Sequence, residues 1–284
     1  MTPDEFCRHG RQVIDWIADY MENVDRYSVY SRIPSRRGPR APAPHAPQQG
    51  EPFEQLLADM TEIILPGITH WQSPNFFAFF PANNSGASIL GDLLSSGLGV
   101  QGMLWSTSPA CTELEAHVLD WVADMLDLPA AYRSSSTGGG VIEDSASSAV
   151  LCALLAARET RTDFTTRACG VDRQLTAYAS IEAQSSVEKA MNIAGLGTEQ
   201  LRRIGTDASR AMRPDALEAA IRHDAAHGFE PCFVCVTVGT TSSGALDPLG
   251  PIGEICHRHG LWLHVDAAMF GTAALCPEYR TIQA

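Results

Sequence analysis

The sequence predicts an α/β protein in which a mostly parallel sheet follows a helical segment at the N-terminus. Three observations support this class. In the second part of the chain, segments with strand character alternate with segments of helical periodicity, as in parallel sheets with crossover helices. The first part instead carries amphipathic helical patterns interrupted by proline. The length of 284 residues and the 45% hydrophobic content suit one large α/β domain with a smaller piece.

The helical segment is expected to span residues 1–83. Thr2 and Glu5 form a capping box, which indicates the start of a first helix. A Pro-rich connector covers 32–50. A second helix follows with an apolar face and a Pro-Gly stop, at Phe53, Leu56, Leu57, Met60, Ile63, Ile64, Pro66 and Gly67. Helices separated by so much proline do not make a compact core alone, so we expect them to pack on a partner subunit.

Residues 84–284 are expected to form the large domain, and the aromatic stretch 70–81 that precedes it is expected to be extended. Its first clear helix starts at Ser108 and Pro109. The expected buried stripe of that helix consists of Leu114, Val118, Val122 and Met125. A Gly-rich loop then leads into another helix near residue 146. Beyond it we expect strands at 174–180, around 201–205, at 232–238 and at 261–265, with helices at about 185–194, 214–227 and 250–259.

Composition excludes several classes of function. The net charge is −13 and Lys189 is the single lysine, which argues against nucleic acid or an anionic membrane as a partner. No apolar run approaches the roughly 20 residues of a membrane helix. The N-terminus is charged and periodic rather than basic and then apolar, so we expect a soluble, cytoplasmic protein.

No metal site is expected. Cys232 and Cys235 lie three residues apart in a predicted strand, which would place their side chains on opposite faces, and no second pair completes a zinc site. They are interpreted as core thiols. A second group of Cys and His residues belongs mostly to a helix end that Gly260 closes, where histidines suit the helix dipole: Cys256, His257, His259 and His264.

A carboxylate follows an apolar run in the stretch "LWLHVDAAMFG", residues 261–271. In parallel sheets, ligands bind beyond the carboxyl ends of the strands, and Asp266 occupies such an end. A carboxylate there needs a partner, and a pyridinium N–H would be a suitable one because the ion pair keeps the ring nitrogen protonated. The short side chains of Ala267 and Ala268 leave room for a flat ring. The stretch 238–244 reaches the same edge one strand earlier.

Ser145, Ala146 and Ser147 stand where the Gly-rich loop enters a helix, and the N–H groups of a first helical turn favour a phosphate. A serine N-cap after glycines is also common without any ligand, and the glycines fit neither a Walker loop nor a dinucleotide fingerprint. Polar residues of "AQSSVEKA", 183–190, reach the same sheet edge. A phosphate cradle, an acid for a ring nitrogen and a slot for a flat ring together predict pyridoxal 5'-phosphate.

Six stretches carry a resemblance to a known family: "PGITHWQSPNFFAFFP", "SPACTELEAHVLDWVADML", "GGGVIEDSAS", "SSVEKA", "VTVGTTSSGALDPL" and "LWLHVDAAMFGTAALCPEYR". They resemble the pyridoxal-phosphate-dependent aromatic L-amino-acid decarboxylases, which are group II carboxy-lyases. The likeness runs from the first helix to residue 284. It implies fold type I, the aspartate-aminotransferase-like fold, with a mostly parallel sheet of the seven-stranded type. It also implies a homodimer that acts on Phe, Tyr, Trp or Dopa.

The resemblance also assigns roles to residues. It implies that Asp266 pairs with the ring nitrogen and is catalytic. The other residues that it places at the cofactor are Ser145, Ala146, Ser147, Gln184, Thr241 and Ala268, with the phosphate at 146–147 and one ring face on Ala268. The substrate pocket that it implies consists of Trp71, Phe79, Phe80, Gln101 and Met103, with 101–103 reaching in from the other subunit. At Gln101, Met103 and Phe79 the side chains differ from those usual in relatives of the family. These differences either alter which aromatic substrate ring the pocket prefers or reflect neutral drift.

Two departures from the family pattern bear on activity. The family's Schiff-base lysine and small C-terminal domain are expected beyond residue 284, and Lys189 falls inside a helix where its expected role is surface charge. The chain is therefore interpreted as a truncated decarboxylase, inactive alone. Gln184 stands where the family usually has a histidine that stacks on the cofactor ring. The resemblance therefore implies a catalytic role for Gln184. The replacement of histidine by glutamine also favours an alternative reaction, aromatic aldehyde synthesis. A catalytically dead dimerising fragment remains open, and an aminotransferase is a weaker alternative.

Overall fold

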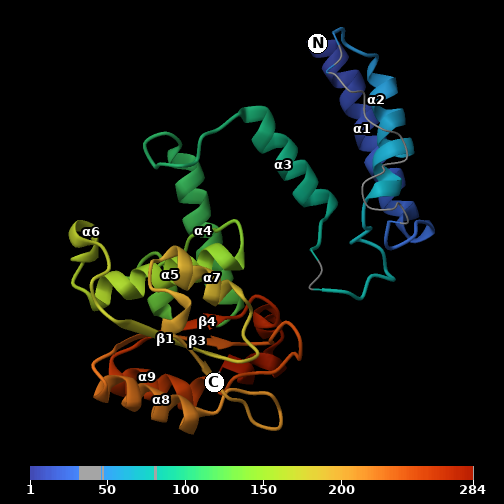
Figure 1. Ribbon diagram of the computed structural model, residues 1–284. Helices are drawn as coiled ribbons and strands as arrows, with labels where there is room; N and C mark the ends of the chain where they lie inside the picture. The colour runs from blue at the N-terminus through green and yellow to red at the C-terminus, as the bar shows by residue number, and fades with distance from the viewer. Residues whose placement is uncertain (32–45, 47, 80–81, 284) are drawn as a thin grey trace. The chain divides into compact units, whose positions relative to one another are not determined.

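The computed structural model describes residues 1–31, 46, 48–79 and 82–283, without the side chains of 281–283. The chain divides into two compact units, Met1–Gly99 and Val100–Ala284 (Figure 1).

The unit Met1–Gly99 is helical. Its helices are α1 (Pro3–Asn23), α2 (Phe53–Asp59) and α3 (Gly86–Leu98). The predicted capping box is confirmed, since Thr2 Oγ1 accepts the Glu5 amide and the Glu5 carboxylate accepts the Thr2 amide. Helix α2 continues through a π-helical turn, Met60–Ile64, and a 3₁₀ turn, Leu65–Gly67, so the predicted stop is also confirmed. Most of the predicted connector 32–50 lies outside the described residues.

The aromatic stretch is not extended over its described residues 70–79, contrary to the sequence prediction, and residues 80 and 81 lie outside the described residues. The Ser73 amide donates to the His70 carbonyl and the Phe76 amide donates to the Ser73 carbonyl, each at 3.0 Å. Ser73 Oγ also accepts the Asn75 amide at 3.3 Å. Serine, proline and asparagine in succession form turns through these local hydrogen bonds, which outweigh the strand preference of the neighbouring aromatic residues.

The unit Val100–Ala284 contains the sheet. Its strands are β1 (Leu175–Ser180), β2 (Leu201–Ile204), β3 (Glu230–Thr237) and β4 (Trp262–Asp266). Its helices are α4 (Pro109–Met125), α5 (Ala146–Arg161), α6 (Thr166–Cys169), α7 (Ser186–Ile193), α8 (Pro214–Ala226) and α9 (Leu249–His259). All strands and helices that the sequence predicts between 146 and 266 are therefore confirmed, with ends shifted by a few residues.

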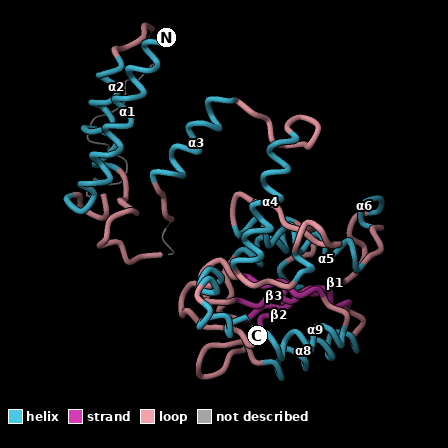
Figure 2. Tube along the Cα trace, turned by 180° about the vertical axis from the view of Figure 1, so that it is seen from behind, coloured by secondary structure: helices cyan, strands magenta, loops and turns pink. Residues whose placement is uncertain are grey.

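The four strands pair in the order β2-β1-β3-β4, and every pairing is parallel (Figure 2). Helices α5 and α7 cover one face of the sheet and α8 and α9 cover the other (Figure 1). Alternate residues of β3 serve the two layers: Phe233 and Cys235 pack with the α5/α7 layer, whereas Val234 and Val236 pack with the α8/α9 layer. This three-layer α/β arrangement confirms the predicted fold class.

Cys232 and Cys235 pack in the same core cluster rather than on opposite faces. The reason is a bulge: Thr176 pairs with Pro231 but Ala177 pairs with Phe233, so Cys232 is an extra residue that breaks the alternation. Both thiols are buried and free, and burial raises the pKa of Cys232 to about 12. They remain core thiols, as interpreted from the sequence.

Two elements are less buried than their apolar sequences indicate. In α4, Leu114 and Met125 are exposed to 64% and 50%, whereas Val118 and Val122 are partly buried, so described residues cover only part of the predicted stripe. Strand β4 is only partly buried, because it is the last strand of the described sheet and has a neighbour on one side. Periodicity predicts the side that an element offers for packing, but it does not predict what covers that side.

Candidate active site

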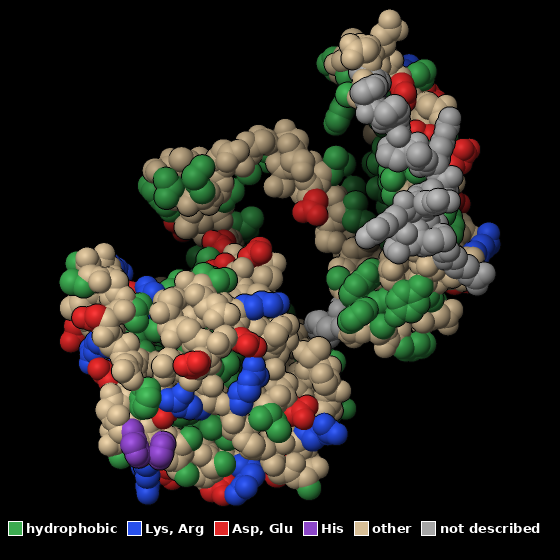
Figure 3. Space-filling model, in the orientation of Figure 1, with side chains coloured by type: hydrophobic (Ala, Val, Ile, Leu, Met, Phe, Trp, Pro, Cys, Tyr) green, Lys and Arg blue, Asp and Glu red, His purple; other side chains and the backbone are tan. Residues whose placement is uncertain are grey.

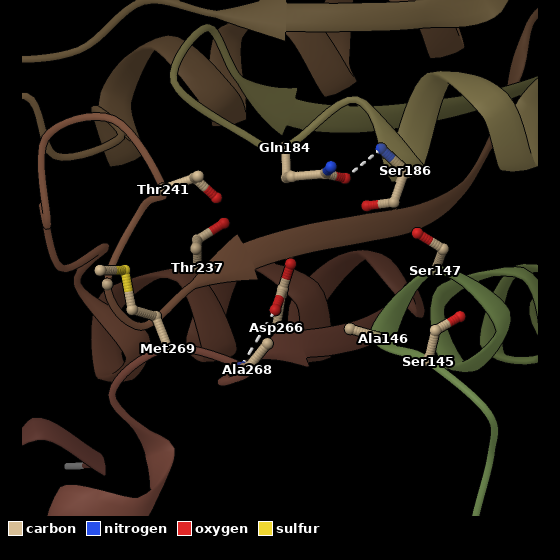
Figure 4. Close-up of a pocket in the computed structure, with 11 residues that line it drawn as sticks. Ser145, Ala146, Ser147, Gln184, Ser186, Thr237, Thr241, Asp266, Ala268 and Met269 are labelled. Carbon is tan, nitrogen blue, oxygen red and sulfur yellow. Dashed lines mark hydrogen bonds between the residues drawn. The ribbon is translucent and has the colours of Figure 1, made fainter. Parts of the chain in front are cut away.

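A cavity of about 280 Å³ opens at the carboxyl ends of β3 and β4 (Figure 4). It is lined by Ser145, Ala146, Ser147, Gln184, Ser186, Thr237, Gly239, Thr241, Asp266, Ala268 and Met269. Strand ends, the N-terminus of α5 and the segment before α7 thus meet at one place. The position agrees with the general rule that ligands of parallel sheets bind beyond the carboxyl ends of the strands.

The start of α5 supplies hydrogen-bond donors to this cavity. Ser145 is the N-cap, and its Oγ accepts the Ser148 amide at 3.3 Å. The first turn of a helix leaves its amides without intrahelical acceptors, so the amides of Ala146 and Ser147 are available to a ligand. The helix has 16 residues, so the positive end of its dipole adds to the attraction for an anion. This wall of the cavity is suited to a phosphate group.

Asp266 supplies the acidic group of the cavity. Its Oδ1 accepts the Ala268 amide at 3.2 Å, and this is the one hydrogen bond to its carboxylate among the described residues. No arginine, lysine or histidine of the described chain forms an ion pair with it. The carboxylate points into the cavity (Figure 4). A cationic N–H group of a ligand would therefore meet a carboxylate with free acceptor positions.

Gln184 lies across the cavity from Asp266 (Figure 4). Its Oε1 accepts the Ser186 amide, which orients the side chain. The amide group of glutamine is flat but does not exchange a proton near neutral pH, in contrast to an imidazole. The side chain can therefore cover one face of a flat ligand without acting as an acid or base.

The turn after β3 places Thr241 at the cavity. Thr240 Oγ1 makes a 2.6 Å hydrogen bond to Ser243 Oγ and accepts the Ala245 amide at 3.0 Å. Gly239 begins the turn with φ of +88°, and a Cβ atom there would lie 2.6 Å from the Phe270 ring. A side chain at this position is excluded by both the backbone conformation and the contact.

Seven of the cofactor residues that the sequence and the resemblance indicated line this one cavity: Ser145, Ala146, Ser147, Gln184, Thr241, Asp266 and Ala268. Sequence reasoning missed Ser186, Thr237, Gly239 and Met269 as lining residues. Ser186 lies within a segment that was assigned to the correct edge, so a residue-by-residue reading of that segment could have found it. Thr237 gives no signal in the sequence, because only strand pairing places it beside Asp266.

The predicted substrate-pocket residues are not among those that line the cavity. Trp71 and Phe79 belong to the unit Met1–Gly99, where their rings stack with centroids 5.8 Å apart. Phe80 lies outside the described residues. Gln101 and Met103 belong to the other unit and are exposed. Their role in substrate binding stays a prediction.

Lys189 does not line the cavity. It is exposed on α7, where Ser186 and Val187 are buried, and this agrees with the surface role that the sequence indicated. Among the described residues, no group of three or more histidine, cysteine, aspartate or glutamate side chains has the geometry of a metal site. No described helix is long and apolar enough to cross a membrane.

Residues 38–284 match the family described as the pyridoxal-dependent decarboxylase conserved domain. The chain is 45% identical to phenylacetaldehyde synthase from Arabidopsis thaliana over 284 residues, which is 99% of this chain and 57% of the relative. It is also 45% identical to aromatic-L-amino-acid decarboxylase from Bos taurus, over 99% of this chain and 58% of the relative. The chain thus spans somewhat more than half the length of these relatives.

The fold is similar to that of a solved tryptophan decarboxylase from Catharanthus roseus in complex with L-tryptophan. The TM-score is 0.93 at 38% sequence identity, and the match covers 99% of this chain and 60% of the other. The family match covers most of the chain, so the chain belongs to the pyridoxal-dependent decarboxylase family. Members of that family are carboxy-lyases whose cofactor is pyridoxal phosphate, and the fold is that of pyridoxal-phosphate fold type I.

The residues present fit this cofactor. The cavity offers helix amides for a phosphate, a carboxylate with free acceptor positions for a ring N–H, and a short side chain beside it for a flat ring. Thr237 Oγ1, on the wall of the same cavity, is a buried hydroxyl oxygen without a hydrogen-bond partner among the described residues. A buried polar atom without a partner calls for an explanation, and a ligand in this cavity would supply one.

Proposed function

We propose that residues 1–284 form the cofactor-binding part of a pyridoxal-phosphate-dependent decarboxylase of aromatic L-amino acids. One observation carries this proposal: the Asp266 carboxylate, without an ion-pair partner in the described chain, faces the same cavity as the N-terminal amides of α5. An acid and a phosphate cradle in one cavity match the ring nitrogen and the phosphate of pyridoxal phosphate. The relatives named above act on, or are solved with, aromatic amino acids.

Each wall of the cavity has a proposed role. The amides of Ala146 and Ser147 bind the phosphate, and Ser145 stabilises that turn as its N-cap. Gln184 covers one face of the ring and Ala268 covers the other. Thr241 contacts the ring edge from the turn after β3. Together these residues hold the ring in one plane.

Asp266 is the proposed catalytic residue of this chain. When bound, pyridoxal phosphate accepts the electron pair that a departing carboxylate leaves on the substrate. The negative charge of Asp266 favours the protonated ring nitrogen, because an opposite charge within hydrogen-bond distance stabilises the cationic form. A fixed charge in a partly dehydrated site needs no reorganisation during the reaction, which is why such groups contribute strongly to rate.

The substrate and the assembly are also proposals. We propose that Trp71, Phe79, Phe80, Gln101 and Met103 form an aromatic-binding pocket across a homodimer, with 101–103 contributed by the second subunit and residues 1–83 packing on it. Large apolar side chains that are more than half exposed support this assembly: Leu94, Leu98, Met103, Leu104 and Trp105. The eight cysteines are free, which suits a reducing compartment such as the cytoplasm.

The test uses the longest polypeptide that contains this sequence, loaded with pyridoxal phosphate. Each of Phe, Tyr, Trp and Dopa is supplied in turn, and released carbon dioxide and amine are measured. We expect release from at least one aromatic amino acid and a loss of about 10²-fold or more in the Asp266→Ala variant. Saturable cofactor binding without carbon dioxide from any of the four would contradict the proposed reaction.

Aromatic aldehyde synthesis is the second candidate, and Gln184 favours it. This residue faces the ring position with an amide that neither gains nor loses a proton near pH 7, and the chain is similar to a phenylacetaldehyde synthase. A site without a nearby proton donor slows protonation of the substrate carbon and leaves time for its two-electron oxidation by dioxygen, which is reduced to hydrogen peroxide. Peroxide and ammonia that accompany aldehyde are the expected products, and Gln184→His is expected to shift them toward amine. Amine formed without peroxide by the unmodified protein would exclude this candidate.

A further inference from the structure

Thr237 ends β3 with a buried hydroxyl that the proposed function does not use. The residue is 4% exposed, and its Oγ1 has no hydrogen-bond partner among the described residues. Other buried threonines of the sheet unit are satisfied: Thr176 Oγ1 lies 3.0 Å from the Tyr178 hydroxyl, and Thr240 Oγ1 lies 2.6 Å from Ser243 Oγ. A buried hydroxyl without a partner is unfavourable for folding. Its presence here therefore calls for a functional explanation.

The hydroxyl belongs to the wall of the cavity, beside the acid. Thr237 pairs with Asp266 in the parallel ladder, so the two side chains project from the same face of the sheet. Neighbouring strands lie about 4.8 Å apart, which places the two side chains within reach of each other. Figure 4 shows both side chains directed into the space below Gln184.

The backbone of Thr237 is fixed on both sides by Asp247. The Thr237 amide donates to Asp247 Oδ2 at 2.8 Å, and the Asp247 amide donates to the Thr237 carbonyl at 3.0 Å. Asp247 Oδ1 also accepts the Met212 amide at 2.7 Å, and the residue is 4% exposed. These bonds leave rotation about χ1 as the main freedom of the Thr237 side chain. The hydroxyl can therefore turn between the cavity and Asp266, but the residue cannot move away.

We propose that Thr237 is a positioning residue for Asp266. When a ligand ring nitrogen occupies the cavity, the Thr237 hydroxyl donates a hydrogen bond to the Asp266 carboxylate and holds that group against the ring N–H. The Ala268 amide already fixes Oδ1, so a second donor would restrict the remaining rotation of the carboxylate. This inference rests on the proposed function, because Asp266 acts on a ring nitrogen only if the cavity binds the cofactor.

The test measures binding of pyridoxamine 5'-phosphate to residues 1–284 by isothermal titration. This ligand keeps the ring and the phosphate but carries an amine, so it cannot form a Schiff base with Lys189. Thr237→Val keeps the shape of the side chain and removes the hydroxyl. We expect about tenfold weaker binding, because a hydrogen bond to a charged group is lost, and recovery of affinity in Thr237→Ser. Equal affinity of the valine variant and the unmodified chain would overturn the inference.

A second ligand separates positioning from direct contact. The analogue with carbon in place of the ring nitrogen cannot pair with Asp266 but fits the same space. The valine variant is expected to bind this analogue as well as the unmodified chain does. An equal loss for both ligands would mean that the hydroxyl acts on the ligand itself and would contradict the proposed role.

Thermal unfolding without ligand gives a readout that a purely structural role would change. Thr237→Val is expected to leave the melting temperature unchanged or raised, since the removed hydroxyl has no partner in the chain. Thr176→Val is the matched control, because it removes a bonded hydroxyl from β1, away from the cavity, and is expected to lower the melting temperature without changing affinity. A destabilised Thr237→Val chain with normal affinity would assign Thr237 to folding alone.

The outcomes also distinguish this inference from the proposed function. If the unmodified chain does not bind pyridoxamine 5'-phosphate, the proposed function fails, and Thr237 has no ring nitrogen on which to act. If the unmodified chain binds and Thr237→Val binds equally, the proposed function stands and only the inference fails.

Discussion

Strand β3 and helix α1 differ in the burial of their apolar side chains. In β3, Phe233 and Val234 are fully buried, because helices cover both faces of the sheet. In α1, Phe6, Ile14 and Met21 are 58%, 45% and 41% exposed. The spacing of these three residues places them within about 80° of one another around the helix axis, so they form one stripe.

The two units differ in whether their own elements cover their apolar side chains. The crossover helices of the sheet unit are consecutive in sequence with the strands that they cover, so its core is closed within the chain. The stripe of α1 is not closed by described residues, although its other side is occupied: Trp16 Nε1 donates to Thr61 Oγ1 at 2.9 Å, and the Tyr20 hydroxyl lies 2.9 Å from His70 Nδ1. The sheet unit is therefore expected to fold by its own core, whereas α1 carries the apolar stripe that we propose a second subunit covers.

The largest expected effect lies in the closed core. Phe233→Ala should lower the free energy of unfolding by about 3–5 kcal/mol, because it removes a large side chain and leaves a cavity. The exposed counterpart Ile14→Ala should change it by less than about 0.5 kcal/mol in a monomeric sample. Urea unfolding followed by circular dichroism measures both. If both substitutions lowered the free energy of unfolding equally, the proposed difference in burial between the two units would be contradicted.

A smaller effect is expected for association. Replacing Phe6, Ile14 and Met21 together by serine should weaken self-association at least tenfold, because it removes apolar area from the proposed dimer surface. Asp15→Ser, an exposed position of α1 outside the stripe, is the matched control. Sedimentation equilibrium gives the dissociation constants. An unchanged dimer in the triple variant would show that this stripe is covered in some other way.

The smallest expected effect is a pH dependence in β4. Burial lowers the pKa of His264 below its usual value, and the nearby Asp266 charge opposes this shift. The unfolded chain therefore binds a proton more readily than the folded chain, so the stability that His264 contributes is present above about pH 6.5 and is lost as the pH falls below it. His264→Gln should make the free energy of unfolding less dependent on pH between 7 and 5. His257→Gln, an exposed histidine of α9, is the control, and identical slopes in all three proteins would refute the assignment.

The sequence allowed much of the fold and site to be predicted, for local physical reasons. Thr2 and Glu5 satisfy each other within one turn, and Asp266 stands at a strand end, which a parallel sheet brings to the ligand edge. The errors required information from other segments. The bulge at Cys232 depends on pairing with β1, and the exposure of Leu114 depends on the absence of a covering element among the described residues. Thr237 could be identified as a residue of the site only from the strand register that pairs it with Asp266.

Asp266 is the residue on which the proposed chemistry depends, because its charge should keep the bound ring nitrogen protonated. Nuclear magnetic resonance of pyridoxamine 5'-phosphate labelled with ¹⁵N in the ring reports that proton directly. In the unmodified chain we expect the bound ring nitrogen to stay protonated to higher pH than in the free ligand, and Asp266→Asn should abolish this difference. The same ring-nitrogen titration in both chains, with ligand bound in each, would contradict the assigned role of Asp266.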